Sequence, residues 1–406
     1  MVFFIFNLGG DPVENLVSEN TSEEVKESIR RKYNLDLSLG KQYLLYLNDI
    51  SPLSVHADED STSRIFFDEM EYSGISIVPL GDDNSIYLKS PYLNRSYISE
   101  RPVSGVLSDA IPGTAILAVT AIVIALILGI LLGVVSARKK DTYVDQVILT
   151  FSSIGMSGPS FFMAILIAWI GGVLLYEMVP IPVLPTFIFL GFLVFGVIQR
   201  LRKKSAHLSI ARYGLIGFGI GVVVWGVGTL ILGTQGWTNH YVALPGTGLP
   251  MSGSWFGVDV WQGRVIQPQN LILPAITLGV RPLAVVVQLT RSSLLEVMGK
   301  DFIRTARAKG LSIRRVIWRH ALPNALNPVI TAISGWFASM LAGAVFVEFV
   351  FGWKGLGLET YSALEKDDLP VVMGAVLVIA LIFVVINLLT DIVYGLIDPR
   401  VRQSSR

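Results

Sequence analysis

Seven long apolar segments constrain this chain more than any other feature, because a helix of roughly 20 apolar residues crosses a lipid bilayer. The expected spans are residues 111–136, 147–176, 180–197, 213–233, 271–290, 325–350 and 371–397. Ser157-Gly-Pro159 interrupts the second span and is expected to bend or break its helix unless neighbours satisfy the freed backbone groups. A content of 52% hydrophobic residues in 406, with a mean hydropathy of +0.59, excludes an ordinary soluble protein. The predicted fold is an all-α integral membrane protein with about seven transmembrane helices.

Two N-terminal segments lie outside these spans. Residues 1–10 form an apolar tip that reaches only about half the hydrocarbon thickness at 1.5 Å per residue. The tip is either buried or interfacial, or it is the truncated remnant of a first span. Residues 11–108 carry seventeen acids against nine Lys or Arg and predict a soluble outer-face insertion. A capping-box spacing of Thr21 and Glu24 predicts a helix to about Tyr33, and alternation in residues 75–80 predicts strands.

The charges of the loops predict an orientation. The strongly basic connections and the basic tail are residues 138–140, 200–212, 291–323 and 400–406. Cytoplasmic loops carry the excess of Lys and Arg, so we expect these segments and the C-terminus in the cytoplasm. The acidic or neutral connections then lie outside. Removing the hairpin 180–233 leaves this topology unchanged, so we interpret it as an accessory insertion.

The stretch from Arg291 to Pro323, named here the basic segment, has eight Lys or Arg and only two acids. Gly310 in its middle and Pro323 at its end predict two short helices. The small side chains of Ala306 and Ala308 predict a helix that enters a groove on a soluble partner. The alternative is a loop whose positive charge only fixes the topology.

Several chemistries are excluded or unsupported. The chain has no cysteine, and its four histidines lack the spacing of metal ligands. It contains no Gly-x-x-x-x-Gly-Lys-Ser/Thr loop for nucleotide phosphates. We therefore expect no catalytic residue, metal or cofactor in this chain, and no nucleic-acid partner.

Four polar residues within or near the spans are candidates for the pore or for bonds between helices: Arg281, Glu348, Asn387 and Asp391. An arginine in mid-membrane is costly unless it faces protein or water. Arg281 is expected either to pair with Asp391 or to meet a substrate carboxylate. Glu348 and Asp391 lie near helix ends as caps or interhelical pairs, and Asn387 is expected to bond between helices.

Residues 296–330, EVMGKDFIRTARAKGLSIRRVIWRHALPNALNPVI, resemble the cytoplasmic loop of binding-protein-dependent ABC transporter permeases. The family signature is Glu-Ala-Ala, three residues, Gly, nine residues, Ile, one residue, Leu-Pro. The matching positions here are Arg304, Thr305, Ala306, Gly310, His320, Leu322 and Pro323. Gly and Leu-Pro keep their spacing. Arg304, Thr305 and His320 depart from the signature in a form similar to the first permease of dipeptide and oligopeptide importers.

Other motifs agree with this resemblance over about residues 105–180 and 268–402. They include Pro112-Gly-Thr114, Gly343 to Glu348, and Asp398-Pro-Arg400. Three departures stand out: the truncated first span, the longer acidic insertion to about residue 100, and the extra hairpin 180–233.

The resemblance implies a transmembrane permease domain at residues 109–402 that forms half of a peptide-importing pore. It implies a second permease, an extracytoplasmic solute-binding protein, and two ATPase subunits that bind ATP and magnesium and grip the basic segment. Related permeases carry nickel and sugars. The rival functions are a secondary transporter and a membrane-embedded enzyme working without ATPase partners. The near absence of acids in mid-span argues against the first, and the lack of clustered catalytic groups against the second.

Overall fold

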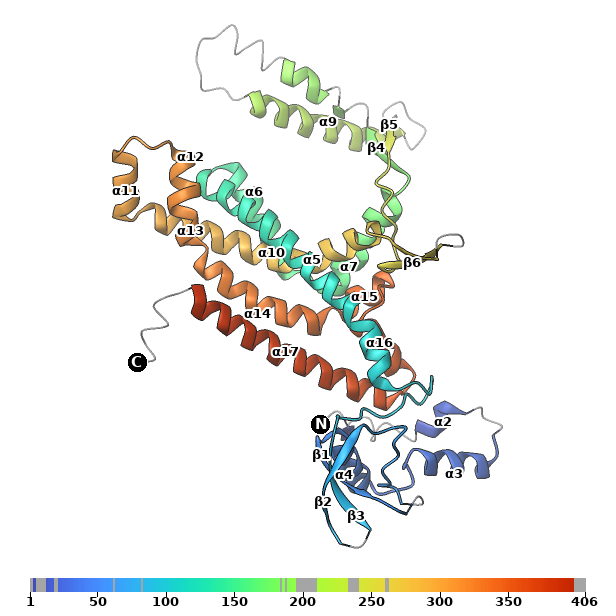
Figure 1. The fold of residues 1–406 in the computed structure, drawn as a ribbon. Coiled ribbons are helices and arrows are strands. Elements are labelled where there is room, and N and C mark those ends of the chain that lie inside the picture. Colours follow the sequence, from blue (N-terminus) through green and yellow to red (C-terminus); the bar gives the residue numbers. More distant parts are fainter. Residues whose placement is uncertain are drawn as a thin grey trace. The chain divides into compact units, whose positions relative to one another are not determined.

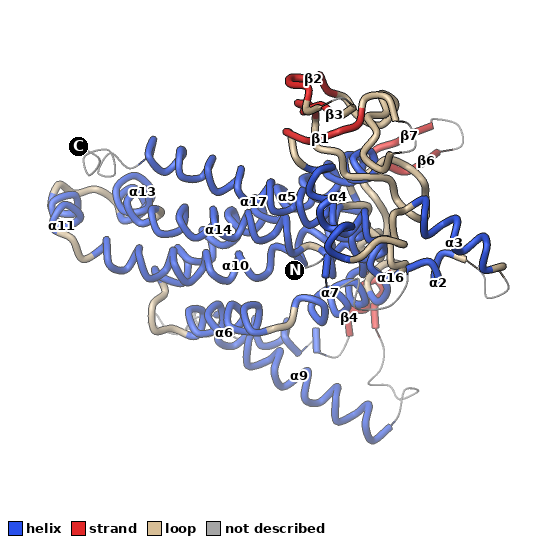
Figure 2. Tube along the Cα trace, turned by 90° about the horizontal axis from the view of Figure 1, so that it is seen from below, coloured by secondary structure: helices blue, strands red, loops and turns tan. Residues whose placement is uncertain are grey.

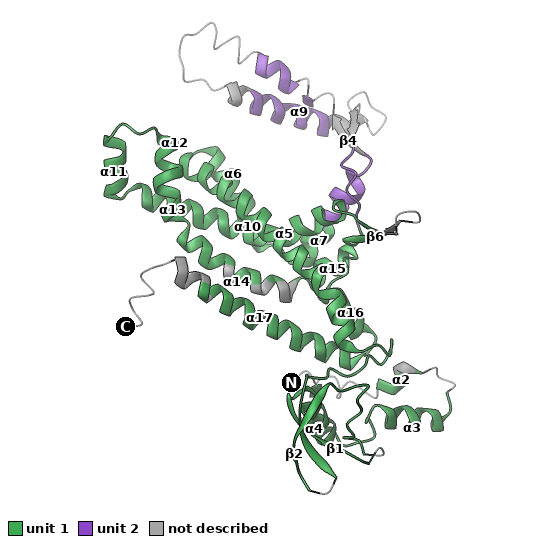
Figure 3. Cartoon of the chain, in the orientation of Figure 1, with its two compact units in different colours: residues 1–165, 252–406 green, residues 166–251 purple. Residues whose placement is uncertain are grey.

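The structure is a computed structural model that describes residues 3–4, 12–17, 21–60, 63–81, 83–182, 185–186, 188–194, 210–232, 241–259 and 263–397. The chain forms two compact units, residues 1–165 with 252–406 and residues 166–251, which Figure 3 distinguishes by colour. Most of the apolar tip, the basic loop around residues 200–209 and the motif at 398–400 lie outside the described residues.

Helices dominate the first unit (Figure 1). Across both units, the described residues include the α-helices α2 (Pro12–Leu16), α3 (Glu23–Lys32), α4 (Leu39–Ile50), α5 (Val103–Arg138), α6 (Tyr143–Ser157), α7 (Ser160–Trp169), α9 (Ile210–Leu232), α10 (Gln269–Met298), α11 (Asp301–Ala308), α12 (Ile313–Val316), α13 (Leu322–Ala325), α14 (Asn327–Gly343), α15 (Val345–Phe351), α16 (Leu356–Glu365) and α17 (Leu369–Ile397). Two π-helical turns, η1 (Ile170–Leu174) and η3 (Ile317–Ala321), extend α7 and α12.

Within the described residues, α5, α10 and α17 are each long and apolar enough to cross a membrane. The α6–α7 pair has the length of a fourth span but bends by 115° at its break. The sequence Ser157-Gly-Pro159 predicted this interruption, because proline removes a backbone donor and disfavours helix in the residue before it. The count of seven spans stays a prediction.

Several predicted boundaries are wrong. Helix α5 begins at Val103, so Pro112 lies inside the helix and not at its start. Residues 180–182, expected as the start of a span, belong to strand β4 (Met178–Pro182), which pairs antiparallel with β5 (Tyr241–Pro245). The expected span 325–350 divides at Ala344 into α14 and α15. At 17 residues, α14 is about 25 Å long, short of a typical hydrocarbon core.

The N-terminal segment, residues 21–101, combines α3 and α4 with a three-stranded antiparallel sheet (Figure 2). The strands β1 (Leu53–Ala57), β3 (Asn84–Lys89) and β2 (Gly74–Pro79) follow in that spatial order, and the alternation in residues 75–80 indeed falls on a strand. The first unit also holds the hairpin of β6 (Phe256–Asp259) and β7 (Gly263–Ile266). Ser22, and not the predicted Thr21, occupies the N-cap position of α3, and its side chain makes no capping hydrogen bond.

Helix α5 organises the first unit. Its 36 residues span about 54 Å, more than the hydrocarbon core. It packs closely along α10, since a Cβ atom at Gly133 would lie 2.6 Å from Cβ of Thr290. The first end of α5, at Val103 and Leu107, is buried with α16 and α17. The last end is buried with α10 to α13. The two apolar clusters therefore lie at opposite ends of α5, a helix long enough to cross a membrane.

Candidate functional site

The basic segment is a helical hairpin that grows out of α10. Residues 291–298, which we expected to lie in the loop, form the last two turns of α10, which ends at Met298. Helix α11 follows, then a turn, and then the consecutive helical turns α12, η3 and α13. Gly310 has a φ of +76° in this turn, a conformation that costs a residue with a Cβ but not glycine. The two predicted short helices and the turn at Gly310 are therefore present. Pro323 lies in the first turn of α13, and the break before α14 comes at Leu326.

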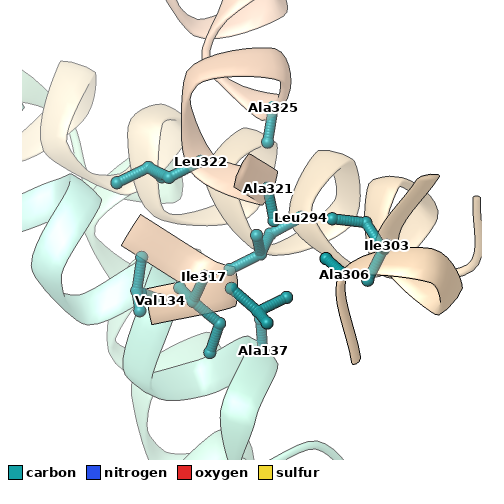
Figure 4. Close-up of a cluster of buried hydrophobic side chains, with 10 residues drawn as sticks. Val134, Ala137, Leu294, Ile303, Ala306, Ile317, Ala321, Leu322 and Ala325 are labelled. Atoms are coloured by element: carbon teal, nitrogen blue, oxygen red, sulfur yellow. The ribbon is translucent and has the colours of Figure 1, made fainter. Parts of the chain in front are cut away.

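One face of this hairpin is buried in the chain's own core. Ile303, Val316 and Leu322 pack with Val134 of α5 and Leu294 of α10. Figure 4 shows Ala306, Ile317 and Ala321 in the same cluster. Ala306 is only 8% exposed, and its small size allows close packing within the chain. The prediction that this helix enters a groove on a partner stays a prediction. Apolar burial therefore fixes the hairpin to the end of α5.

The opposite face of the hairpin is exposed and combines charge with large apolar groups. Phe302, Ile313 and Trp318 have exposed fractions of 48%, 47% and 46%. Exposed polar and small residues surround them: Arg304, Thr305, Arg307, Ala308, Lys309, Arg314, Arg315 and Arg319. Arg304 pairs with Asp301 at 3.3 Å, whereas the other cations of this list have no acidic partner among the described residues. His320 is half-buried and Pro323 is exposed. The predicted signature positions thus divide between a buried anchor and an exposed face.

Arg291, counted among the positive charges of the segment, is neutralised by Asp145 in the first turn of α6. Its Nε and Nη2 donate to the two carboxylate oxygens at 2.8 and 2.7 Å. Ser136 Oγ and the Asp141 amide also donate to this carboxylate. Asp145 is 2% exposed and the Arg291 side chain 20%. The pair joins α5, α6 and α10, and sequence reasoning missed Asp145. The sequence signal that could have indicated Asp145 is its place as the one acid in the first turn of the helix that follows the basic loop 138–140.

At the other end of α5, Glu348 lies in a closed hydrogen-bond network. Thr114 Oγ1 donates to its carboxylate at 2.6 Å, and the Leu358 amide donates at 3.0 Å. Thr114 Oγ1 accepts from the Leu356 amide at 2.8 Å. Fully buried Trp353 donates its Nε1–H to the Gly113 carbonyl at 2.9 Å. Glu348 is fully buried. Its carboxylate accepts hydrogen bonds from Thr114 on α5 and from the amide of Leu358 in the first turn of α16.

The remaining polar candidates lie apart from these two sites. Arg281 is exposed on α10 and lines a pocket at the α6–α7 break. Asn387 is half-buried on α17, and no described residue gives it the expected interhelical hydrogen bond. The side chain of Asp391 lies outside the described part of the structure, so its pairing with Arg281 stays a prediction.

Residues 129–403 match the family described as "Binding-protein-dependent transport system inner membrane component". The dipeptide transport system permease protein DppB of Haemophilus influenzae is 34% identical over 309 residues, covering 76% of each chain. The protein of that name from Escherichia coli K12 is 40% identical over 221 residues, 51% of this chain and 65% of the relative. That from Alkalihalophilus pseudofirmus is 28% identical over 393 residues, 97% of this chain and 90% of the relative. The chain thus belongs to the family of binding-protein-dependent transport system inner membrane components.

Proposed function

We propose that this chain is a pore-forming permease subunit of an ATP-driven ABC importer for dipeptides or oligopeptides. The names of the three relatives support the peptide class. The basic loops support a multi-pass orientation in the inner membrane with the C-terminus in the cytoplasm. One observation carries the proposal most directly: the basic segment is anchored on one face and exposes cations and large apolar side chains on the other.

This exposed face has the composition of a protein docking surface. Aromatic and arginine residues dominate the binding energy of interfaces, and here Trp318 and Phe302 lie among exposed cations, most of which have no acidic partner in the described part of the chain. A groove lined with acids on an ATPase subunit would complement both features. ATP and magnesium bind to two such subunits and not to this chain.

Movement of the ATPases reaches the membrane through the anchored face. Because Ile303 and Ile317 are packed against α5 and α10, a displacement of the hairpin displaces both spans. The Asp145–Arg291 pair carries the same displacement to α6, the first half of the broken span. The basic segment transmits force in this scheme and performs no chemistry.

The other partners fit the remaining surfaces. A second permease completes the pore, lipid surrounds the spans, and a solute-binding protein delivers peptide at the Glu348 end of α5. The N-terminal segment is fastened at this end, because the Tyr97 amide donates to Asp368 at 3.0 Å, just before α17. We place the segment beside the surface that receives the binding protein.

The test is peptide uptake by the complete complex, with both permeases, both ATPases and the binding protein, in proteoliposomes. We expect ATP-dependent uptake of a labelled dipeptide. Replacing Trp318 by alanine should weaken ATPase association by about 30-fold, equivalent to about 2 kcal/mol. Alanine in place of Met70, which is 89% exposed in the N-terminal segment, is the control and should leave association unchanged. Uptake that needs no ATPase subunit would refute the proposal.

A further inference from the structure

We propose that Arg281 binds the terminal carboxylate of the transported peptide, in a pocket at the break between α6 and α7; this inference rests on the proposed peptide import. The pocket, named here the Arg281 pocket, contains about 130 Å³. Its lining includes Gly158, Ser160, Met163, Arg281, Trp336 and Met340.

The position of Arg281 requires a ligand or a partner. Along α10 it lies about 18 Å from Gln269 and about 26 Å from Met298, at membrane depth. A guanidinium at this depth must face protein or water. Its side chain is exposed in this chain, and no described residue pairs with it. Its counter-charge therefore comes from a group outside the described part of the chain.

The broken span adds to the attraction for an anion. Ser160 begins α7 and lines the same pocket as Arg281. The first amide groups of a helix lack partners within it and carry partial positive charge. Among the described residues, no acid lines the pocket. A carboxylate placed there meets a guanidinium and a helix start together.

The apolar walls suit side chains of different shapes. Met163 and Met340 line the pocket with Trp336, and methionine adapts to varied surfaces because it is unbranched and polarisable. A peptide importer must accept many side chains, whereas the terminal carboxylate is common to its substrates. The fixed arginine recognises the shared carboxylate, and the adaptable walls tolerate the variable side chains. Arginine also offers two parallel donors to a carboxylate.

The size of the pocket indicates a half-site. Pockets that enclose drug-sized ligands usually hold about 300–1,000 Å³, well above the 130 Å³ here. The pocket thus holds the carboxyl-terminal end of a peptide, and the second permease covers the rest.

The experiment compares import of a hydrophobic dipeptide with import of its C-terminal amide, using the complete reconstituted complex. Binding protein fully loaded with each labelled compound is supplied in excess, so that its own selectivity does not enter the rate. We expect wild type to import the acid at least about 10-fold faster than the amide. In Arg281→Gln the acid should slow by about 10-fold and the ratio of the two rates should approach one. In Arg281→Lys the ratio should be intermediate.

Gln288→Ala is the matched control, two turns along α10 and outside the pocket; it should keep the wild-type ratio. An unchanged ratio in Arg281→Gln, or equal rates in wild type, overturns the inference and favours a counter-charge on Asp391 or on the second permease. If Arg281→Gln does not assemble, the ratio in assembled Arg281→Lys decides in the same way. Failure of wild type to import either compound with ATP would instead refute the proposed function.

Discussion

The two ends of α5 differ in how their polar groups are satisfied. At the Glu348 end, the carboxylate, the Thr114 hydroxyl and the Trp353 indole all find partners within the chain. At the basic segment, apolar packing supplies the anchor, Arg291 is paired with Asp145, and most other cations lack partners among the described residues. A closed network specifies one geometry, whereas exposed and hydrated cations stay available to a partner. We therefore assign a structural role to the first end and propose docking for the second.

The largest expected effect lies at the closed end. Glu348→Leu removes the acceptor of both Thr114 Oγ1 and the Leu358 amide. Leaving a buried donor unpaired costs about 1–3 kcal/mol, so we expect a loss of about 4 kcal/mol in the free energy of unfolding. Glu348→Gln keeps the shape and one acceptor and should lose less than half as much. Thermal unfolding of the purified complex measures both variants. Equal stability of Glu348→Leu and wild type would break the contrast between the two ends.

The next effect concerns the ion pair of the basic segment that is mostly buried, Arg291 with Asp145. Asp145→Ala leaves the mostly buried Arg291 without a counter-charge, at a cost of about 3 kcal/mol. Because the pair joins α6 to α10, we also expect less peptide imported per ATP hydrolysed. Exchanging the residues, with Asp145→Arg and Arg291→Asp together, should recover part of both losses. Wild-type coupling in Asp145→Ala would show that the pair transmits nothing.

The N-terminal segment predicts a pH dependence at the closed end. Burial raises the pKa of Asp49 from 3.8 to about 6, despite a 2.9 Å hydrogen bond from Tyr72 Oη. Because the pKa of Asp49 is higher in the folded state than in the unfolded state, its protonation stabilises the fold at low pH. This contribution is complete below the unfolded-state pKa and is lost as the pH rises through about 6. The shift corresponds to about 3 kcal/mol. Asp49→Asn should therefore slow hydrogen exchange of strand β3 at pH 7.5 and have little effect near pH 4. Faster exchange in Asp49→Asn at pH 7.5 would contradict this sign.

A smaller effect belongs to the turn of the basic segment. Gly310 has open space where a Cβ would lie, so only its φ of +76° opposes substitution. Gly310→Val should cost about 1.5 kcal/mol and lower uptake while the protein remains inserted. Gly310→Asn should be milder, because asparagine tolerates this conformation. Uptake assays of both variants with matched protein levels test the prediction. Uptake at the wild-type rate in Gly310→Val would show that the turn at Gly310 is not needed for coupling ATP hydrolysis to uptake.

The sequence predicted features that depend on local chemistry. The turn at Gly310 and the break at Ser157-Gly-Pro159 follow from glycine and proline, whose backbone preferences act within a few residues. Long-range packing was not accessible. Nothing in the sequence of α11 indicates that Ala306 faces α5, and Asp145 meets Arg291 across 146 positions. Residues 178–182 form a strand by pairing with residues 241–245, which lie far along the chain. The local sequence therefore does not reveal this strand.

The most direct test of the docking claim uses the absence of cysteine in this chain. Ala306 and Ala308 are two residues apart on α11, but the first is buried and the second exposed. A single cysteine at each position, in turn, is offered to a short cross-linker in the assembled transporter. We predict that Ala308→Cys is joined to an ATPase subunit and that Ala306→Cys is not. Labelling of Ala308→Cys from the exterior of intact cells, or its failure to join any ATPase, would contradict it.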